Sequence, residues 1–397
     1  MKKLHALALL FLIILTPYCY AQKKEISQAQ TIVKSGKNLA QAEQQMRKLL
    51  KDSVNQKNIK VWVILTEAVR GQYLAGNERM YLRQQQDTAA LFKLALKMFG
   101  DYQSLDSVDA LPDKKGRVHL KYRNSNSAFL NIYRPNLYNG GVYFLRKQNY
   151  KEAFSMIDAF LDCQRQPLFE NYHYERDTLN RTAAFWTVLC GYQTGDHEMA
   201  LKYKDLALQD TLHLESCFQY LAEIYKQQGD KPNYEWSLVK GFECNPSSSY
   251  FFPRLIDYYN TSNQTERAMT IVNDALQTND SSELFLFAKS NLLLNQGDYD
   301  ECIAICDTLI ARNDTLADAY YNAGVAYVNK AFLLEKGKVD VKQRKEIRKL
   351  YQKALPYMER YRALAPQEKD KWAAALYNIY LKLNMGKQFE EIDQMLR

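Results

Sequence analysis

Residues 215–246 read ESCFQYLAEIYKQQGDKPNYEWSLVKGFECNP, and the pattern of this stretch recurs every 34 residues along the chain. Segments of the same phase end near Thr211 or cover residues 218–246, 252–280 and 286–314. One column of the repeat holds mostly small residues, namely Ala200, Tyr234, Ala268 and Cys302. A second column is a turn, formed by Gly195-Asp196, Gly229-Asp230, Asn263-Gln264 and Gly297-Asp298. A fixed period of this length indicates supersecondary units that bury their apolar faces only by stacking on one another.

Each unit is predicted to contain two helices. In the quoted stretch, Phe218, Leu221 and Tyr225 follow helical spacing up to the Gly229-Asp230 turn. A second apolar series follows the turn, and Pro246 marks the end of its helix. The pattern therefore predicts a helix–turn–helix hairpin in which small residues allow close approach and large residues fill the space between hairpins.

The hairpin pattern resembles the tetratricopeptide repeat. Leu221-Ala222, Tyr225, Gly229-Asp230 and Pro246 carry this resemblance, which extends over about two-thirds of the chain in units of the length typical for the family. It implies an all-α fold, a right-handed α-solenoid of stacked helix–turn–helix hairpins. Members of this family are in general interaction modules, and the resemblance does not identify the partner.

The repeat phase also predicts the domain organisation. Residues 131–397 are expected to form the solenoid, with insertions near 163–180 and 331–349, the second being two lengthened helices joined near Gly337. Residues 22–130 fit the period less well and are predicted to be degenerate helical repeats continuous with the solenoid. Within them, Asp101–Lys121 has the composition of a loop, with Pro112-Asp113 and Gly116.

Residues 1–21 have the pattern of a secretory signal peptide. Two lysines precede a short apolar run, Ala6–Leu15, and small residues precede a cut after Ala21. The alternative is a lipoprotein anchored at Cys19, although the bulky Tyr18 before it does not resemble a lipobox. No later apolar stretch is long enough to cross a bilayer. The expected location is the periplasm or another part of the bacterial envelope.

Charge and motif content argue against two classes of function. The chain has 53 Lys and Arg against 45 Asp and Glu, and the two signs are interleaved, so nucleic acid is not the expected partner. Phosphate-binding, dinucleotide-binding, zinc-protease and nucleophile-elbow motifs are absent from the sequence. Its histidines do not combine with other ligands into a recognisable metal motif. We therefore predict a protein that is not an enzyme, with no cofactor and no metal.

The first helices of stacked hairpins line a concave groove, and this geometry predicts a binding surface. The candidate groove residues, in chain order, are Tyr138, Phe185, Tyr192, Gln219, Lys226, Tyr250, Asp257, Phe287, Asn291 and Tyr321. Peptide-clamping members of the family hold a terminal carboxylate with lysines and asparagines, and only Asn291 matches that arrangement. The expected function is a non-catalytic scaffold or adaptor that binds an extended or helical segment of an envelope protein.

A second hypothesis is a surface glycan-binding protein. The chain resembles aromatic-rich helical-repeat proteins on the surfaces of Bacteroidetes, in which aromatic rings stack on sugars. Its 29 tyrosines fit this idea. Its four tryptophans and the absence of a lipobox fit it less well.

Six cysteines follow residue 21, and an even number in an exported protein permits disulfides. Cys217 begins the first helix of a hairpin and Cys244 follows the second, so antiparallel packing would bring both to one end. This pair is the disulfide candidate. The alternative is that all six are small core residues with reduced thiols.

Asp followed by Ser or Thr and then a small or branched apolar residue occurs seven times, whereas average composition would give on the order of one or two. This triplet is similar to the acceptor sequence for O-glycosylation of exported proteins in Bacteroidetes. The hydroxyl residues concerned are Ser53, Thr88, Ser107, Thr178, Thr211, Thr308 and Thr315. Ser107 and Thr178 are expected in long loops. The alternative is helix capping by the aspartate, which does not require the third residue.

Overall fold

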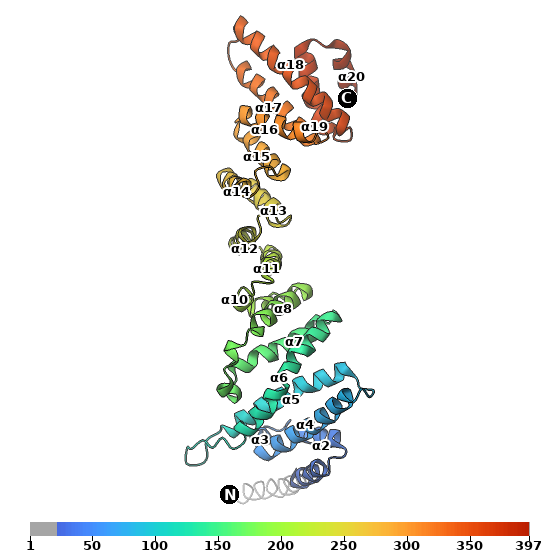
Figure 1. The fold of residues 1–397 in the computed structure, drawn as a ribbon, viewed down its shortest axis with the longest axis vertical. Coiled ribbons are helices and arrows are strands. Elements are labelled where there is room, and N and C mark those ends of the chain that lie inside the picture. Colours follow the sequence, from blue (N-terminus) through green and yellow to red (C-terminus); the bar gives the residue numbers. More distant parts are fainter. Residues whose placement is uncertain (1–21, 397) are drawn as a thin grey trace, which may run out of the picture. The chain divides into compact units, whose positions relative to one another are not determined.

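The computed structural model describes residues 22–396, and all regular structure in that range is helical (Figure 1). The predicted signal peptide lies outside these residues. The chain divides after Gln227 into two compact units, which we call unit 1 and unit 2. In each unit a helix packs mainly on the helices next to it in the chain. This arrangement confirms the predicted all-α solenoid of stacked hairpins.

Unit 1 begins with a helix over residues 22–35. The helices that follow are α2 (Leu39–Leu49), α3 (Ser53–Gln56), α4 (Ile59–Tyr81), α5 (Thr88–Asp109), α6 (Arg123–Arg146), α7 (Tyr150–Asp162), α8 (Leu179–Thr194), α9 (His197–Leu201), α10 (Lys204–Ala207) and α11 (Leu214–Gln228). Three 3₁₀ turns stand between α7 and α8: η1 (Cys163–Arg165), η2 (Pro167–Tyr172) and η3 (Tyr174–Arg176). They occupy the predicted insertion near 163–180.

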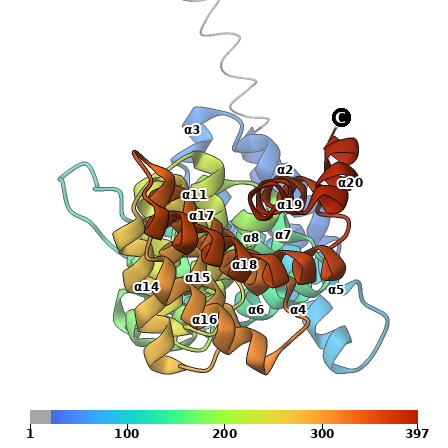
Figure 2. The same ribbon diagram turned by 90° about the horizontal axis from the view of Figure 1, so that it is seen from above.

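The helices of unit 2 are α12 (Lys231–Cys244), α13 (Phe251–Thr261), α14 (Thr265–Thr278), α15 (Glu283–Gln296), α16 (Tyr299–Arg312), α17 (Ala317–Glu335), α18 (Val341–Leu364), α19 (Lys369–Leu383) and α20 (Gly386–Leu396). Helix α12 is followed by four hairpins, the last formed by α19 and α20. Helices α17 and α18 are lengthened and joined around Gly337, and α19 packs on α18 (Figure 2).

The turn column has one backbone conformation in four successive hairpins. Gly195, Gly229 and Gly297 adopt φ values of 69°, 71° and 89°, and Asn263 adopts 56° at the equivalent position. Glycine takes this left-handed conformation without steric cost, and asparagine is among the side chains that tolerate it best. At two of these turns the aspartate after the glycine caps the next helix. Asp196 accepts a hydrogen bond from the Met199 amide at 2.9 Å, and Asp230 accepts one from the Asn233 amide at 3.2 Å.

Two boundaries differ from the sequence prediction. Helix α5 continues to Asp109, so the loop expected from Asp101 begins only after that residue. Two acidic residues at the end of α5 contact residues that follow the loop. Asp106 forms an ion pair with Arg123 at 2.8 Å, and Asp109 accepts a hydrogen bond from the Tyr122 amide at 2.8 Å. The predicted division between residues 130 and 131 falls inside helix α6, and the compact units divide after Gln227.

Over residues 22–396, no helix is both long and apolar enough to cross a bilayer.

Candidate partner-binding surface

The predicted groove residues of unit 1 divide into buried and accessible side chains. The prediction that Phe185 contacts a partner is wrong, because only 3 % of the surface of this residue is exposed. Its ring lies between the rings of His213, 4.5 Å away, and Tyr220, 6.1 Å away, so it is part of the core. Tyr138 is half-buried with its ring 5.5 Å from that of Phe160. Packing therefore accounts for both aromatics.

Tyr192, Gln219 and Lys226 remain accessible in unit 1. Lys226 is exposed in the last turn of α11, and Gln219 is half-buried near its start. Tyr192 on α8 stacks on Tyr220 of α11 with ring centroids 4.9 Å apart and an interplanar angle of 26°. Two successive hairpins thus contribute one ring each to a single surface.

A third phenol belongs to the same surface. Burial raises the pKa of Tyr220, and the neighbouring phenols Tyr192 and Tyr150 add to that effect. Tyr150 is the first residue of α7 and is half-buried, as are the other two. We call Tyr150, Tyr192 and Tyr220 the tyrosine cluster. Half-buried tyrosines offer apolar ring area together with a hydroxyl that donates or accepts hydrogen bonds, a combination that is common at protein interfaces.

Sequence reasoning missed Tyr220 and Tyr150. Tyr220 lies 34 residues after Trp186, so an aromatic column directly follows the column of Phe185 and Gln219. That column was the available signal. Side chains of neighbouring helical residues point about 100° apart. An error of one position in the repeat therefore selects side chains that face the core instead of the groove.

The predicted residues of unit 2 lie on α13, α15 and α17 or directly before α13. Asp257 is exposed on α13. Tyr250 is half-buried beneath Arg254, whose guanidinium carbon lies 3.8 Å from the ring centroid. This cation–π contact covers one face of the ring.

Two further candidates of unit 2, Asn291 and Tyr321, take part in the packing of α15, α17 and α18. The Asn291 side chain accepts a hydrogen bond at 2.7 Å from the amide of the buried Asn322, which also donates to Ser290. Tyr321 packs its ring 5.0 Å from that of Tyr361. Phe287 is half-buried. Asn291 is therefore engaged in holding two first helices together.

The predicted disulfide is not formed. Cys217 is a free thiol in the core of unit 1, whereas Cys244 ends α12 on the surface. The other four cysteines of the described chain are buried thiols, as the reduced alternative anticipated.

We expect the five buried thiols to resist alkylation in the folded protein, with Cys244 reacting first. Burial raises the pKa of Cys163, Cys190 and Cys217 to about 12, so almost no reactive thiolate is present at pH 8. Mass spectrometry after brief maleimide treatment measures this, with a urea-unfolded sample as control. Rapid labelling of Cys217 without denaturant would contradict the structure.

The hydroxyls of the seven Asp-Ser/Thr triplets are mostly accessible. Ser107 was expected in a loop but lies in the last turns of α5, where it donates to the Gln103 carbonyl. Thr178 lies exposed between the 3₁₀ turns and α8, as expected. Several of the aspartates have structural roles, since Asp52 and Asp87 cap helices α3 and α5. O-glycosylation stays a prediction.

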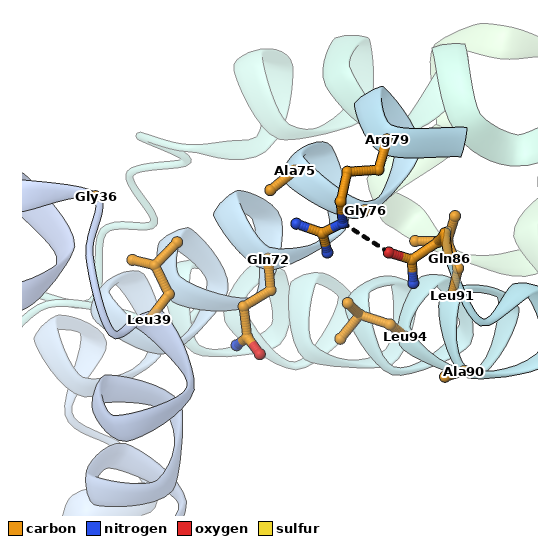
Figure 3. A pocket seen from close by; sticks show the side chains of 10 residues that line it. All are labelled: Gly36, Leu39, Gln72, Ala75, Gly76, Arg79, Gln86, Ala90, Leu91 and Leu94. Carbon is orange, nitrogen blue, oxygen red and sulfur yellow. Dashed lines mark hydrogen bonds between the residues drawn. The ribbon is translucent and has the colours of Figure 1, made fainter. Parts of the chain in front are cut away.

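A hollow of about 290 Å³ lies where α2, α4 and α5 of unit 1 meet (Figure 3). Arg79 Nε donates to Gln86 Oε1 at 2.9 Å beside it. The lining contains no carboxylate and no histidine, so it offers no pair of groups for acid–base chemistry. Within residues 22–396 no three His, Cys, Asp or Glu side chains are grouped so that they could hold a metal ion.

Comparisons with known proteins concern the architecture alone. No family model matches the chain, and no curated protein matches it. Among solved structures it is similar to the C-terminal part of a tetratricopeptide-repeat protein from Cytophaga hutchinsonii, with 11 % identity, TM-score 0.42, and coverage of 64 % of this chain and 92 % of that one. It is also similar to YrrB, described as a tetratricopeptide-repeat protein with an unusual peptide-binding site, with 18 % identity, TM-score 0.35, and coverage of 49 % and 91 %.

A tetratricopeptide-repeat protein from Parabacteroides merdae matches with 12 % identity, TM-score 0.24, and coverage of 77 % of this chain and 99 % of that one. At these scores none of the three transfers a function to this chain. The predicted resemblance to tetratricopeptide repeats is confirmed as one of fold. It rests on the hairpins themselves, whose left-handed Gly or Asn turns recur with the 34-residue period.

Proposed function

We propose that this protein is a non-catalytic scaffold that binds a segment of another protein in the bacterial cell envelope. The tyrosine cluster of unit 1 carries the proposal, because the half-buried Tyr192 of α8 stacks on the half-buried Tyr220 of α11. Tyr150 begins α7, which packs on α8. Tyrosine gives a large contact area at low cost in conformational entropy. The envelope location rests on the signal-peptide pattern of residues 1–21.

The surroundings of the cluster support an elongated partner. Gln219 and the exposed Lys226 extend the accessible surface along α11, over about two helical turns. A polar amide, a cation and three phenols suit a partner segment with both apolar and hydrogen-bonding groups. An extended strand or one face of an amphipathic helix presents such groups at regular intervals.

The glycan alternative is less well supported by this geometry. Sugar recognition by aromatic residues uses an open ring face, and Tyr192 and Tyr220 each direct one face toward the other at 4.9 Å. The two rings therefore form a continuous amphipathic patch, which suits a protein segment better than a stacked sugar.

We expect Tyr192→Gln to weaken binding to a partner isolated from envelope extracts by at least about tenfold, since interface tyrosines are frequent hot spots. Affinity purification with the whole chain, followed by titration of the isolated partner, measures this effect. Tyr81→Gln is the matched control, because Tyr81 is an 86 % exposed tyrosine at the end of α4 in the same unit. Equal binding by both variants, or retention of the chain on a polysaccharide column with no protein recovered, would refute the proposal.

A further inference from the structure

The excess of positive charge in this chain is concentrated in one segment of unit 2. Between Lys336 and Lys353 there are eight basic residues and two acidic ones, whereas the whole chain has 53 and 45. The segment covers the loop after α17 and the first half of α18. This segment together with residues 330–335 at the end of α17 is called the basic arm, residues 330–353. Basic and acidic residues are interleaved in the rest of the sequence, whereas basic residues predominate in the arm.

Lysines of the basic arm surround a hollow of about 490 Å³. Its lining consists of Lys330, Lys342, Lys345, Glu346, Lys349, Leu350 and Lys353. The lysines of α18 fall on one face because they are spaced three or four residues apart. Lys330 pairs with Asp300. Within residues 22–396 no ion pair involves Lys342, Lys345, Lys349 or Lys353, and Glu346 is the one carboxylate among the lining residues.

Apolar side chains are exposed at the end of the same arm. Val341, the first residue of α18, is 71 % exposed, and Leu333 and Phe332 near the end of α17 are 51 % and 38 % exposed. These three residues flank the loop over residues 336–340. Exposed apolar groups next to a cluster of cations indicate a partner that supplies both anionic and apolar surface.

We propose that the basic arm docks on a membrane surface that contains anionic phospholipids. The lysines contact headgroup phosphates, and Val341 and Leu333 enter the boundary between headgroups and acyl chains. Lysine is well suited to this position because its apolar stem lies along the interface while its ammonium group reaches the phosphates.

Two other anionic partners fit the arm less well. Protein interfaces are depleted in lysine and enriched in arginine, which binds carboxylates through two parallel hydrogen bonds, yet the hollow contains lysines alone as cations. Nucleic acid would neutralise the lysines but leave Val341 and Leu333 in water. The docking goes beyond the partner binding proposed for unit 1 and does not depend on the tyrosine cluster.

The test is co-sedimentation of the whole chain with vesicles. We expect clear binding to phosphatidylcholine vesicles in which about a third of the lipid is the anionic phosphatidylglycerol. Binding to vesicles of phosphatidylcholine alone should be much weaker. Changing Lys342, Lys345, Lys349 and Lys353 together to glutamine should reduce binding to the anionic vesicles by roughly six hundredfold, because each lysine near the surface contributes about fivefold. Raising the salt concentration should weaken binding of the unmodified chain.

The matched control changes Lys57, Lys60, Lys114 and Lys115 to glutamine, which removes the same charge from exposed positions in unit 1. This variant should keep most of the binding. Equal losses in both variants would overturn the proposal in favour of a net-charge effect. Binding to duplex DNA or polyglutamate without binding to vesicles would also overturn it. Val341→Trp gives a second readout, because quenching of the new indole by brominated lipids is expected if the end of the arm enters the bilayer.

Discussion

Gly191→Ala is expected to lower the free energy of unfolding of unit 1 by about 3 kcal/mol. Gly191 lies on α8, where α9 crosses closest to it. A Cβ at this position would lie 2.3 Å from the Ala200 amide nitrogen and 2.4 Å from the Ala200 Cα. These are backbone atoms, so the contact is relieved only by moving one helix away from the other. Hydrogen exchange measured by mass spectrometry on peptides from α8 reports the change locally.

Gly100→Ala is the matched control for this prediction. Gly100 is an exposed residue inside α5, and a Cβ there would have no neighbour within 4 Å. The same substitution should therefore stabilise unit 1 by about 0.5–1 kcal/mol, because alanine favours the helix over glycine. Similar effects of the two substitutions would show that α8 and α9 do not approach each other as described.

The repeat columns made much of the fold predictable. Gly195, Gly229 and Asn263 were recognisable as turn residues because few side chains tolerate a positive φ. Ala200, Ala268 and Cys302 were recognisable as a small column, and all three are fully buried. In both cases a local physical requirement recurs at a fixed spacing, so the sequence alone reveals it.

The neighbours of small residues were harder to predict. The small residues of a hairpin were expected to allow close approach within that hairpin. A Cβ at Gly241 would instead lie 2.1 Å from the Phe251 ring, which belongs to the next helix, α13. A glycine shows that something approaches the backbone closely, but the identity of the neighbour depends on how the hairpins stack.

The candidate site was predictable only in part, for a related reason. Tyr192 was identified and is accessible, whereas Phe185 on the same helix is in the core. An aromatic residue suits either environment, and helical spacing does not distinguish the groove face from the stacking face. The insertion near 331–349 was predicted as two lengthened helices, but the hollow between its lysines depends on the packing of α18 on α17.

Asp177→Ala is expected to destabilise unit 1 by about 3 kcal/mol, because it leaves a buried cation without its counterion. Arg134 of α6 is buried, and its guanidinium lies between the rings of Phe160 and Tyr174, with centroid distances of 3.8 and 4.0 Å. Arg134 Nη1 donates to Asp177 Oδ2 at 2.6 Å, and Nη2 donates to Asn180 at 3.2 Å. These contacts attach the 3₁₀ insertion to the hairpin of α6 and α7. Chemical denaturation measures the loss, and faster proteolysis within 163–178 should accompany it.

Two further variants separate the ion pair from the other role of Asp177, which also accepts the Leu179 amide at the start of α8. Asp196→Ala removes a similar cap from α9 and no ion pair, so it should cost only about 1 kcal/mol. Arg134→Met combined with Asp177→Ala should be less damaging than Asp177→Ala alone, since the unpaired charge is gone and a methionine fits between the two rings. If the double variant were the less stable of the two, the stacking of Arg134 on Phe160 and Tyr174 would be the main stabilising contact, and the pair with Asp177 would be secondary.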